Sequence, residues 1–340
     1  MLIDALSAAA ASASTTADLV NHHAFVNLAS RLHWSVIVSA LVLACVAWRL
    51  NRDRDPNARS KGFFAYLFPR HIWLHRSALL DYRFVFFDKL VIALLLAGVT
   101  LLVVPGAEDL ADDIGDEIVD QVIEADYWVV LAYTAVLLLF DDFLRYWTHR
   151  MMHTSRVLWQ FHKVHHSPEV LVPISQMRHH PVNGIINLAR NGFSTAVVTG
   201  AFVLMFPGDL NVVTILGVNA GRMVFYLTGG NLRHSHVWLS FGPVLSHIFI
   251  SPAQHQIHHS KAPEHIDRNF GSQFALWDWM FGTLYVPKQF EPLELGIDAD
   301  STERMRTIRG LYVEPVKDAV KVWRARRADP MASRVSPPAE

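Results

Sequence analysis

The sequence predicts an all-α fold, an integral membrane bundle of about four or five transmembrane helices with a cytoplasmic helical cap. Three observations support this class. Of the 340 residues, 51% are hydrophobic and only 18% are charged, whereas soluble domains usually carry about a quarter charged residues. The apolar residues are concentrated in a few long runs. Histidine is concentrated too, because 14 of the 19 histidines lie between His149 and His265.

Five apolar runs are candidate spans, since a helix needs ~20 apolar residues to cross the hydrocarbon core. They are residues 34–48, 89–104, 127–140, 184–206 and 211–227. The turn sequence Pro207-Gly208-Asp209 separates the last two and predicts a helical hairpin. We therefore divide the chain into an exposed N-terminal segment (1–32), three transmembrane helices with their loops (33–139), a histidine-rich domain that includes the hairpin 184–227 (140–286), and a polar cytoplasmic tail (287–340).

Charge predicts the orientation of the spans. The loop between the first two spans is basic, whereas the loop after the second span holds nine acidic residues and no lysine or arginine. Because basic loops stay in the cytoplasm, the acidic loop is expected outside. The histidines before and after the hairpin then share one face, the cytoplasmic face, where they can form a single site.

Three histidine motifs have the spacing of metal ligands. They are the HxxxH pair His149 and His153, the HxxHH triplet His162, His165 and His166, and a second triplet, His255, His258 and His259. Residues three and four apart face the same side of a helix. A lone pair of this kind is usually coincidence, but three motifs on one face favour a metal site.

The number of histidines predicts two metal ions. Eight imidazoles exceed the four ligands that one zinc ion takes. Imidazole binds Fe, Zn, Cu and Ni alike, so ligand type does not select the metal. The formal net charge of −1 gives no basic surface for nucleic acid, and the single cysteine, Cys45, excludes an intramolecular disulfide.

These motifs resemble the fatty acid hydroxylase / sterol desaturase superfamily of integral-membrane di-iron oxygenases. The resemblance runs roughly over residues 140–286 and includes FDDFLRYWTHRMMH, LWQFHKVHHSPE, MRHHP, SPAQHQIHHS and DRNFGSQFALWDWMFGTLY. The upstream stretch KGFFAYLFPRHIWLHRSALLDYRF is similar to bacterial members, which implies a bacterial inner membrane. The resemblance implies an oxidoreductase that uses O₂ to hydroxylate or desaturate a C–H bond of a membrane lipid.

The resemblance also implies site residues and partners. The eight motif histidines would ligate two iron ions, for which zinc can substitute in a recombinant sample. His234 stands where a further ligand is typical, and His180 is a tenth candidate; no ligand role is assigned to His236. Asp142 is a candidate for orienting a metal-bound imidazole, and Asp267, Asn269 and Asp278 could brace the ligands. Electrons would come from a separate donor, ferredoxin-like or a haem carrier with a reductase.

Two other classes compete with this interpretation. A histidine-rich metal transporter or metal-binding protein would place ligands within the spans, near the middle of the membrane. Here the motifs lie beyond the predicted span ends. A zinc hydrolase usually has three protein ligands and a catalytic glutamate, whereas this chain has too many histidines and only Glu169 nearby.

Overall fold

The computed structural model describes residues 31–59, 62–103, 127–206 and 223–328, with only the backbone described for 93–103. This part of the chain is helical, with two isolated β-bridges and no strand. The all-α prediction is therefore confirmed for the described residues. The acidic loop 104–126, the turn at 207–209 and most of the fifth predicted span lie outside them.

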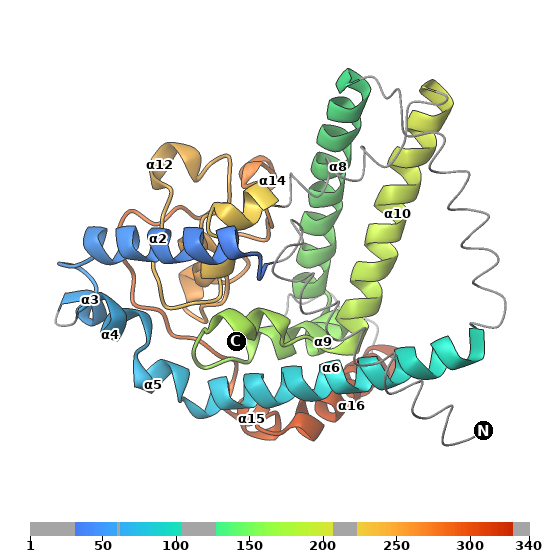
Figure 1. Cartoon of the computed structure of the whole chain (residues 1–340). Helices are drawn as coiled ribbons and strands as arrows, with labels where there is room; N and C mark the ends of the chain where they lie inside the picture. Colours follow the sequence, from blue (N-terminus) through green and yellow to red (C-terminus); the bar gives the residue numbers. More distant parts are fainter. Residues whose placement is uncertain (1–30, 60–61, 104–126, 207–222, 329–340) are drawn as a thin grey trace, which may run out of the picture.

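Two long helices, α8 (Tyr127–Thr154) and α10 (Pro181–Met205), lie side by side (Figure 1). Their contact is apolar and includes Tyr133 and Phe202, whose rings meet edge to face. The Tyr133 hydroxyl also pairs with Thr199 at 2.9 Å. Away from this contact, both helices expose large apolar side chains, among them Leu188 and Leu204. An apolar outer surface suits lipid better than water.

Within the described residues, α8 and α10 are the two helices that are long and apolar enough to cross a membrane. The first predicted span forms a shorter apolar helix, α2 (Trp34–Leu50). The second forms the C-terminal half of α6 (Arg76–Val103). In Figure 1, α2 and α6 run across the direction of α8 and α10 rather than along it.

Helix α2 packs on the chain around His234. Ala44 and Ala47 are fully buried in a cluster with Leu232, Val237 and Leu239. Their small side chains let the helix approach this irregular segment closely, and the Asn51 amide then donates to the Trp238 carbonyl at 2.7 Å. The short helices α3 (Pro56–Arg59), α4 (Phe63–Leu67) and α5 (Arg70–Trp73) connect α2 to α6.

A buried arginine joins α6 to the segment after α9 (Arg156–His166). Arg178 follows the short helix η1 (Pro173–Met177) and is 2% exposed. Its guanidinium binds the Asp81 carboxylate, the Ser77 carbonyl at 2.7 Å and the Ser167 hydroxyl at 3.1 Å. A planar guanidinium can satisfy all three partners at once, so the C-terminal end of α9 is fixed to α6.

The remaining described elements follow α10 along the chain. They are η2 (Gly230–Leu232), α12 (Gly242–Leu245), α13 (Pro252–His258), η3 (Pro263–His265), α14 (Leu276–Met280), α15 (Ala299–Arg304) and α16 (Ile308–Ala328). The last two occupy the region expected to be a tail. They pack on α9 and α6 through Met305 and Leu311, which are buried with Val164 and Phe84.

Candidate metal centre

Nine of the ten predicted histidines come together in two groups. The first histidine group contains His149 and His153 from α8, His162 and His166 from α9, and His258 from α13. The second histidine group contains His165 from α9, His234 after η2, and His255 and His259 at α13. Within each group, one ring nitrogen of every histidine lies within 4.8 Å of the others.

Helix geometry decides how the two HxxHH motifs divide. On α9, His162 and His166 are four residues apart and share the first group, while His165 enters the second. On α13 the assignment is reversed, because His255 and His259 share the second group and His258 enters the first. Each motif therefore supplies both groups, and the rings of His166 and His259 stack where the groups meet, 4.5 Å between centroids.

The two helices that carry HxxHH motifs, α9 and α13, each begin with a serine cap. The Ser155 hydroxyl accepts from the Leu158 N–H at the start of α9. At the start of α13, Ser251 and Gln254 form a reciprocal capping box, followed by Pro252 at the first helical position. Caps satisfy N–H groups that would otherwise be unpaired. They hold these short helices in place in a buried setting.

Backbone carbonyls orient two rings of the first group. His149 Nδ1 lies 2.7 Å from the Phe270 carbonyl and His258 Nδ1 lies 2.8 Å from the Arg268 carbonyl. A carbonyl only accepts, so each Nδ1 carries the proton and each Nε2 keeps its lone pair. This is how proteins commonly prepare imidazole to ligate a metal through Nε2.

Several buried ring nitrogens have no hydrogen-bond partner, which is unusual for buried polar atoms. Seven belong to the two groups: His153 Nε2, His165 Nδ1, His234 Nδ1, His255 Nδ1, His258 Nε2, and both nitrogens of His259. In the second group, His234 Nε2 and His255 Nε2 face each other at 2.9 Å. Inward-facing lone pairs without donors fit a pair of cations.

The electrostatic setting favours neutral imidazoles. Burial, reinforced by neighbouring histidines, lowers the pKa of His162, His165 and His166 well below the usual value. The pKa values of His258 and His259 are lowered in the same way. Neutral imidazole is the form that binds a metal, so these residues can act as ligands at neutral pH without first losing a proton.

Asp142 reaches the histidines only indirectly. Its carboxylate accepts from the backbone N–H groups of Gln273 and Phe274 at 2.9 and 3.0 Å and from the Trp277 indole at 3.1 Å. Asp142, the candidate for orienting an imidazole, therefore holds the loop that carries the Phe270 carbonyl instead of bonding a ring itself. It lies about two turns before His149 on α8, since a helix has ~3.6 residues per turn, so its short side chain does not reach the rings.

The other bracing candidates hold the same loop. Asp278 accepts from the N–H groups of Phe270 and Gly271 at 2.8 and 2.7 Å. Asn269 has a left-handed backbone (φ 56°), and its amide binds the carbonyls of Gln254 and Tyr285. Asp267 approaches His153 Nδ1 at 3.9 Å. Residues 267–278 therefore form a support for the rings of α8 and α13.

His180 lies outside both groups, and its two ring nitrogens are already engaged. Nδ1 caps α10 by accepting from the Val182 N–H, and Nε2 lies 3.0 Å from the Tyr312 carbonyl. Its neighbour His179 instead stacks on His165, with centroids 4.2 Å apart. The sequence motif contains both histidines but does not indicate which faces the site. His236 binds the Tyr66 carbonyl at 2.7 Å, consistent with no ligand role.

A cavity of about 360 Å³ adjoins the second histidine group. Its lining includes four histidines and polar residues of α8 and α10; the histidines are His165, His179, His234 and His255. The polar side chains on α8 and α10 are Asp141, Arg145, Asn187, Asn191, Ser194 and Thr195. Asp141 connects the two helices, since it binds Arg190 and accepts from the Ser194 hydroxyl at 2.9 Å.

The sequence of this region is similar to known proteins. Residues 134–283 match the fatty acid hydroxylase family. Ornithine lipid hydroxylase OlsE of Rhizobium tropici is 28% identical over 51% of this chain and 47% of its own length. Alkylglycerol monooxygenase of Xenopus tropicalis is 28% identical over 56% of this chain and 37% of its own.

A sterol enzyme matches as well. Delta(7)-sterol 5(6)-desaturase ERG3A of Gibberella zeae is 28% identical over 46% of this chain and 38% of its own length. The chain therefore spans less than half the length of these curated relatives. No solved structure matches.

Proposed function

We propose that this protein is a membrane-bound oxidoreductase of the fatty acid hydroxylase / sterol desaturase superfamily, which uses O₂ to hydroxylate or desaturate a C–H bond of a lipid. The match of residues 134–283 to the fatty acid hydroxylase family and the similarity to lipid hydroxylases and a sterol desaturase support the proposal. The observation that carries the proposal is the pair of histidine groups buried at one end of the apolar helix α8. Nine imidazoles in two groups are suited to hold two metal ions.

We assign one iron ion to each histidine group, with zinc as a substitute in a recombinant sample. Iron ions held by these histidines would supply the chemistry for activating O₂ and oxidising the C–H bond. The protein holds the imidazoles neutral and aims them, through the Phe270 and Arg268 carbonyls for His149 and His258. Six of the nine histidines are buried and His149, His153 and His255 are partly buried, so the centre is shielded from bulk water.

The substrate is proposed to be a lipid with a polar headgroup. The cavity beside the second histidine group is lined by three arginines (Arg31, Arg145 and Arg233) and one aspartate (Asp141). Such a lining suits an anionic or zwitterionic headgroup better than a sterol ring system. The names of two relatives, an ornithine lipid hydroxylase and an alkylglycerol monooxygenase, agree with a polar lipid.

We propose that α8 and α10 span the bacterial inner membrane and that the site lies on its cytoplasmic face; the length and apolar surface of these helices support a membrane location. Electrons are proposed to come from a separate donor protein, ferredoxin-like or a haem carrier with a reductase. The alternative, a histidine-rich metal-binding or transport protein, places its ligands within the spans. Here the ligands of α8 lie in its last two turns, after Arg145.

The experiment that tests the proposal combines metal content with lipid products. Purified protein is expected to contain about two metal ions per chain, and His165→Ala is expected to lose metal and activity together. Comparison of lipids from cells with and without the gene should reveal a hydroxylated or desaturated polar lipid. One ion per chain at full occupancy, or full activity after the substitution, would contradict the proposal.

The headgroup assignment has its own control. Asn187→Leu removes a polar wall of the cavity without touching a histidine, so it should slow turnover of the polar lipid more than it lowers metal content. An equal rate on a sterol and on the polar lipid would contradict the assignment while leaving the oxygenase proposal intact.

A further inference from the structure

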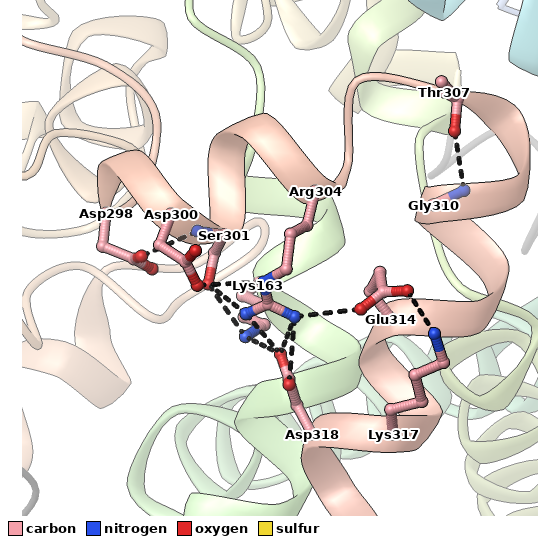
Figure 2. Close-up of polar contacts among 10 residues, drawn as sticks. All are labelled: Lys163, Asp298, Asp300, Ser301, Arg304, Thr307, Gly310, Glu314, Lys317 and Asp318. Carbon is pink, nitrogen blue, oxygen red and sulfur yellow. Dashed lines mark hydrogen bonds and ion pairs between the residues drawn. The ribbon is translucent and has the colours of Figure 1, made fainter.

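Lys163 is buried in the middle of the helix that carries three candidate ligands. It follows His162 directly and lies on the side of α9 that faces α15 and α16 (Figure 2). Its side chain is 6% exposed, and Nζ lies 2.8 Å from Asp318 Oδ2 and 3.3 Å from the Ser301 hydroxyl. An ammonium group in this position is costly unless it is paired, so the pairing with α16 is a strong constraint.

Asp318 is held from the other side by a second cation. Arg304, the last residue of α15, places Nη1 and Nη2 each 3.1 Å from Asp318 Oδ2. Arg304 also contacts Glu314 at 3.1 Å and Asp300 at 2.9 Å, as Figure 2 shows. The Asp318 carboxylate is therefore fixed between Lys163 and Arg304 and has little freedom to follow a movement of α9.

The next residue of α9 makes apolar contacts, which are less specific in direction. Val164 packs among Phe84, Met305 and Leu311. Apolar contacts of this kind provide stability, but they tolerate small rotations and shifts. A buried ion pair contributes less net stability than its geometry suggests, and its best-attested use is to specify one arrangement. The Lys163–Asp318 pair can therefore fix the rotation of α9 about its axis.

That rotation matters because α9 supplies both histidine groups. His162 and His166 enter the first group and His165 enters the second. We propose that Lys163 and Asp318 are positioning residues, through which the segment 298–318 sets the directions of these three imidazoles. The segment lies beyond the family match at 134–283. The inference rests on the proposed function, since it needs the histidines to be ligands.

The test compares metal binding with fold stability. Lys163→Met keeps the length of the side chain and removes its charge; Lys317→Met makes the same change at an exposed lysine of α16 that pairs with Glu314. Each protein is titrated with Co²⁺ alone, and the visible absorption of the bound ion reports its ligand geometry. For Lys163→Met we expect at least about a tenfold loss of affinity and an altered spectrum, with helix content retained. Lys317→Met should match the wild type.

A double variant keeps the test decisive if Lys163→Met does not fold. Lys163→Met with Asp318→Leu leaves no unpaired buried charge, so it should fold while Co²⁺ affinity stays low. Wild-type affinity and spectrum in the single or double variant would overturn the positioning role. Failure of the wild type to bind Co²⁺ would instead contradict the proposed function.

Discussion

The Nε2 atoms of His149 and His162 lie 3.1 Å apart in the first histidine group. His149 donates from Nδ1 to the Phe270 carbonyl, so its Nε2 faces His162 with a lone pair. His162 contacts the Asn183 amide through Nδ1, and the Asn183 Oδ1 atom has no partner. If the Asn183 amide is rotated by half a turn, its Oδ1 atom accepts from His162 Nδ1. The Nε2 atoms of His149 and His162 are then both free to bind one cation.

Removal of metal should therefore destabilise the protein. Without a cation, buried lone pairs face one another and lose the stabilisation that binding supplies, about 2.7 kcal/mol when free metal is at 100 times Kd. We expect a chelator to lower the thermal midpoint and added Fe²⁺ or Co²⁺ to restore it. The measurement is thermal unfolding in detergent, followed by circular dichroism. An unchanged midpoint would argue against occupied metal sites.

The two groups should be separable by substitution. His258→Ala removes a ligand of the first group, and His255→Ala removes one of the second. Each should lower the metal content from about two ions per chain toward one, measured by elemental analysis. His247→Ala is the matched control, because His247 belongs to neither histidine group and its ring contacts the Pro243 carbonyl and the Trp279 ring. Loss of metal in the control would show that the effect is not site-specific.

Loss of the Asp142 carboxylate should destabilise the fold and the loop that supports the metal centre. Its carboxylate satisfies two backbone N–H groups and the Trp277 indole. Asp142→Leu leaves these donors without a partner, and we expect a loss of at least about 2 kcal/mol of unfolding free energy. Denaturant titration measures it, with Glu303→Gln as an exposed control. A loss below that of the control would contradict the role assigned to the carboxylate.

Sequence reasoning predicted the members of the site better than their arrangement. Spacing alone identified the eight motif histidines, and the resemblance added His234. Neither could assign His165 to a different group from His162 and His166, because that depends on where α8, α13 and η2 lie around α9. Neither spacing nor the resemblance could decide whether His179 or His180 faces the site. Adjacent residues just before a helix start point to opposite sides.

The C-terminal region shows a second limit of prediction from the sequence. Residues after 287 are polar and were expected to form a tail, but α15 and α16 bury Met305, Leu311 and Ala319. Pro315 lies within α16, and a proline inside a run of residues argues against a helix there. Partners such as Lys163 and Asp318 are 155 residues apart, and no local pattern connects them.

Asp278 should give the stability of the protein a distinct pH dependence. Burial raises its pKa to about 6, above the usual 3.8. The folded protein therefore favours the protonated form, so the stabilisation is full at low pH and is lost as pH rises through about 6. In Asp278→Asn this dependence is absent. The difference in unfolding free energy, wild type minus variant, should fall between pH 5 and pH 7.5; a constant difference would contradict the assignment.

The orientation can be checked by labelling. A cysteine introduced as Asp113→Cys, in a Cys45→Ser background, lies in the acidic loop that the charge pattern places outside. A membrane-impermeant thiol reagent should label it in intact cells. Arg54→Cys is the internal control and should be labelled only after the cells are opened. Labelling of position 54 but not 113 in intact cells would reverse the predicted orientation.

The exchange of histidines between helices has a consequence for how the two ions are bound. Helices α9 and α13 each supply both groups, so the separation between the ions is set by the rise and rotation of two short helices. Binding of an ion in one group would hold both helices and so orient the rings of the other group. Metal titration of the wild type should therefore be cooperative, and the ion that remains in His258→Ala or His255→Ala should be removed by a lower concentration of chelator than either ion of the wild type.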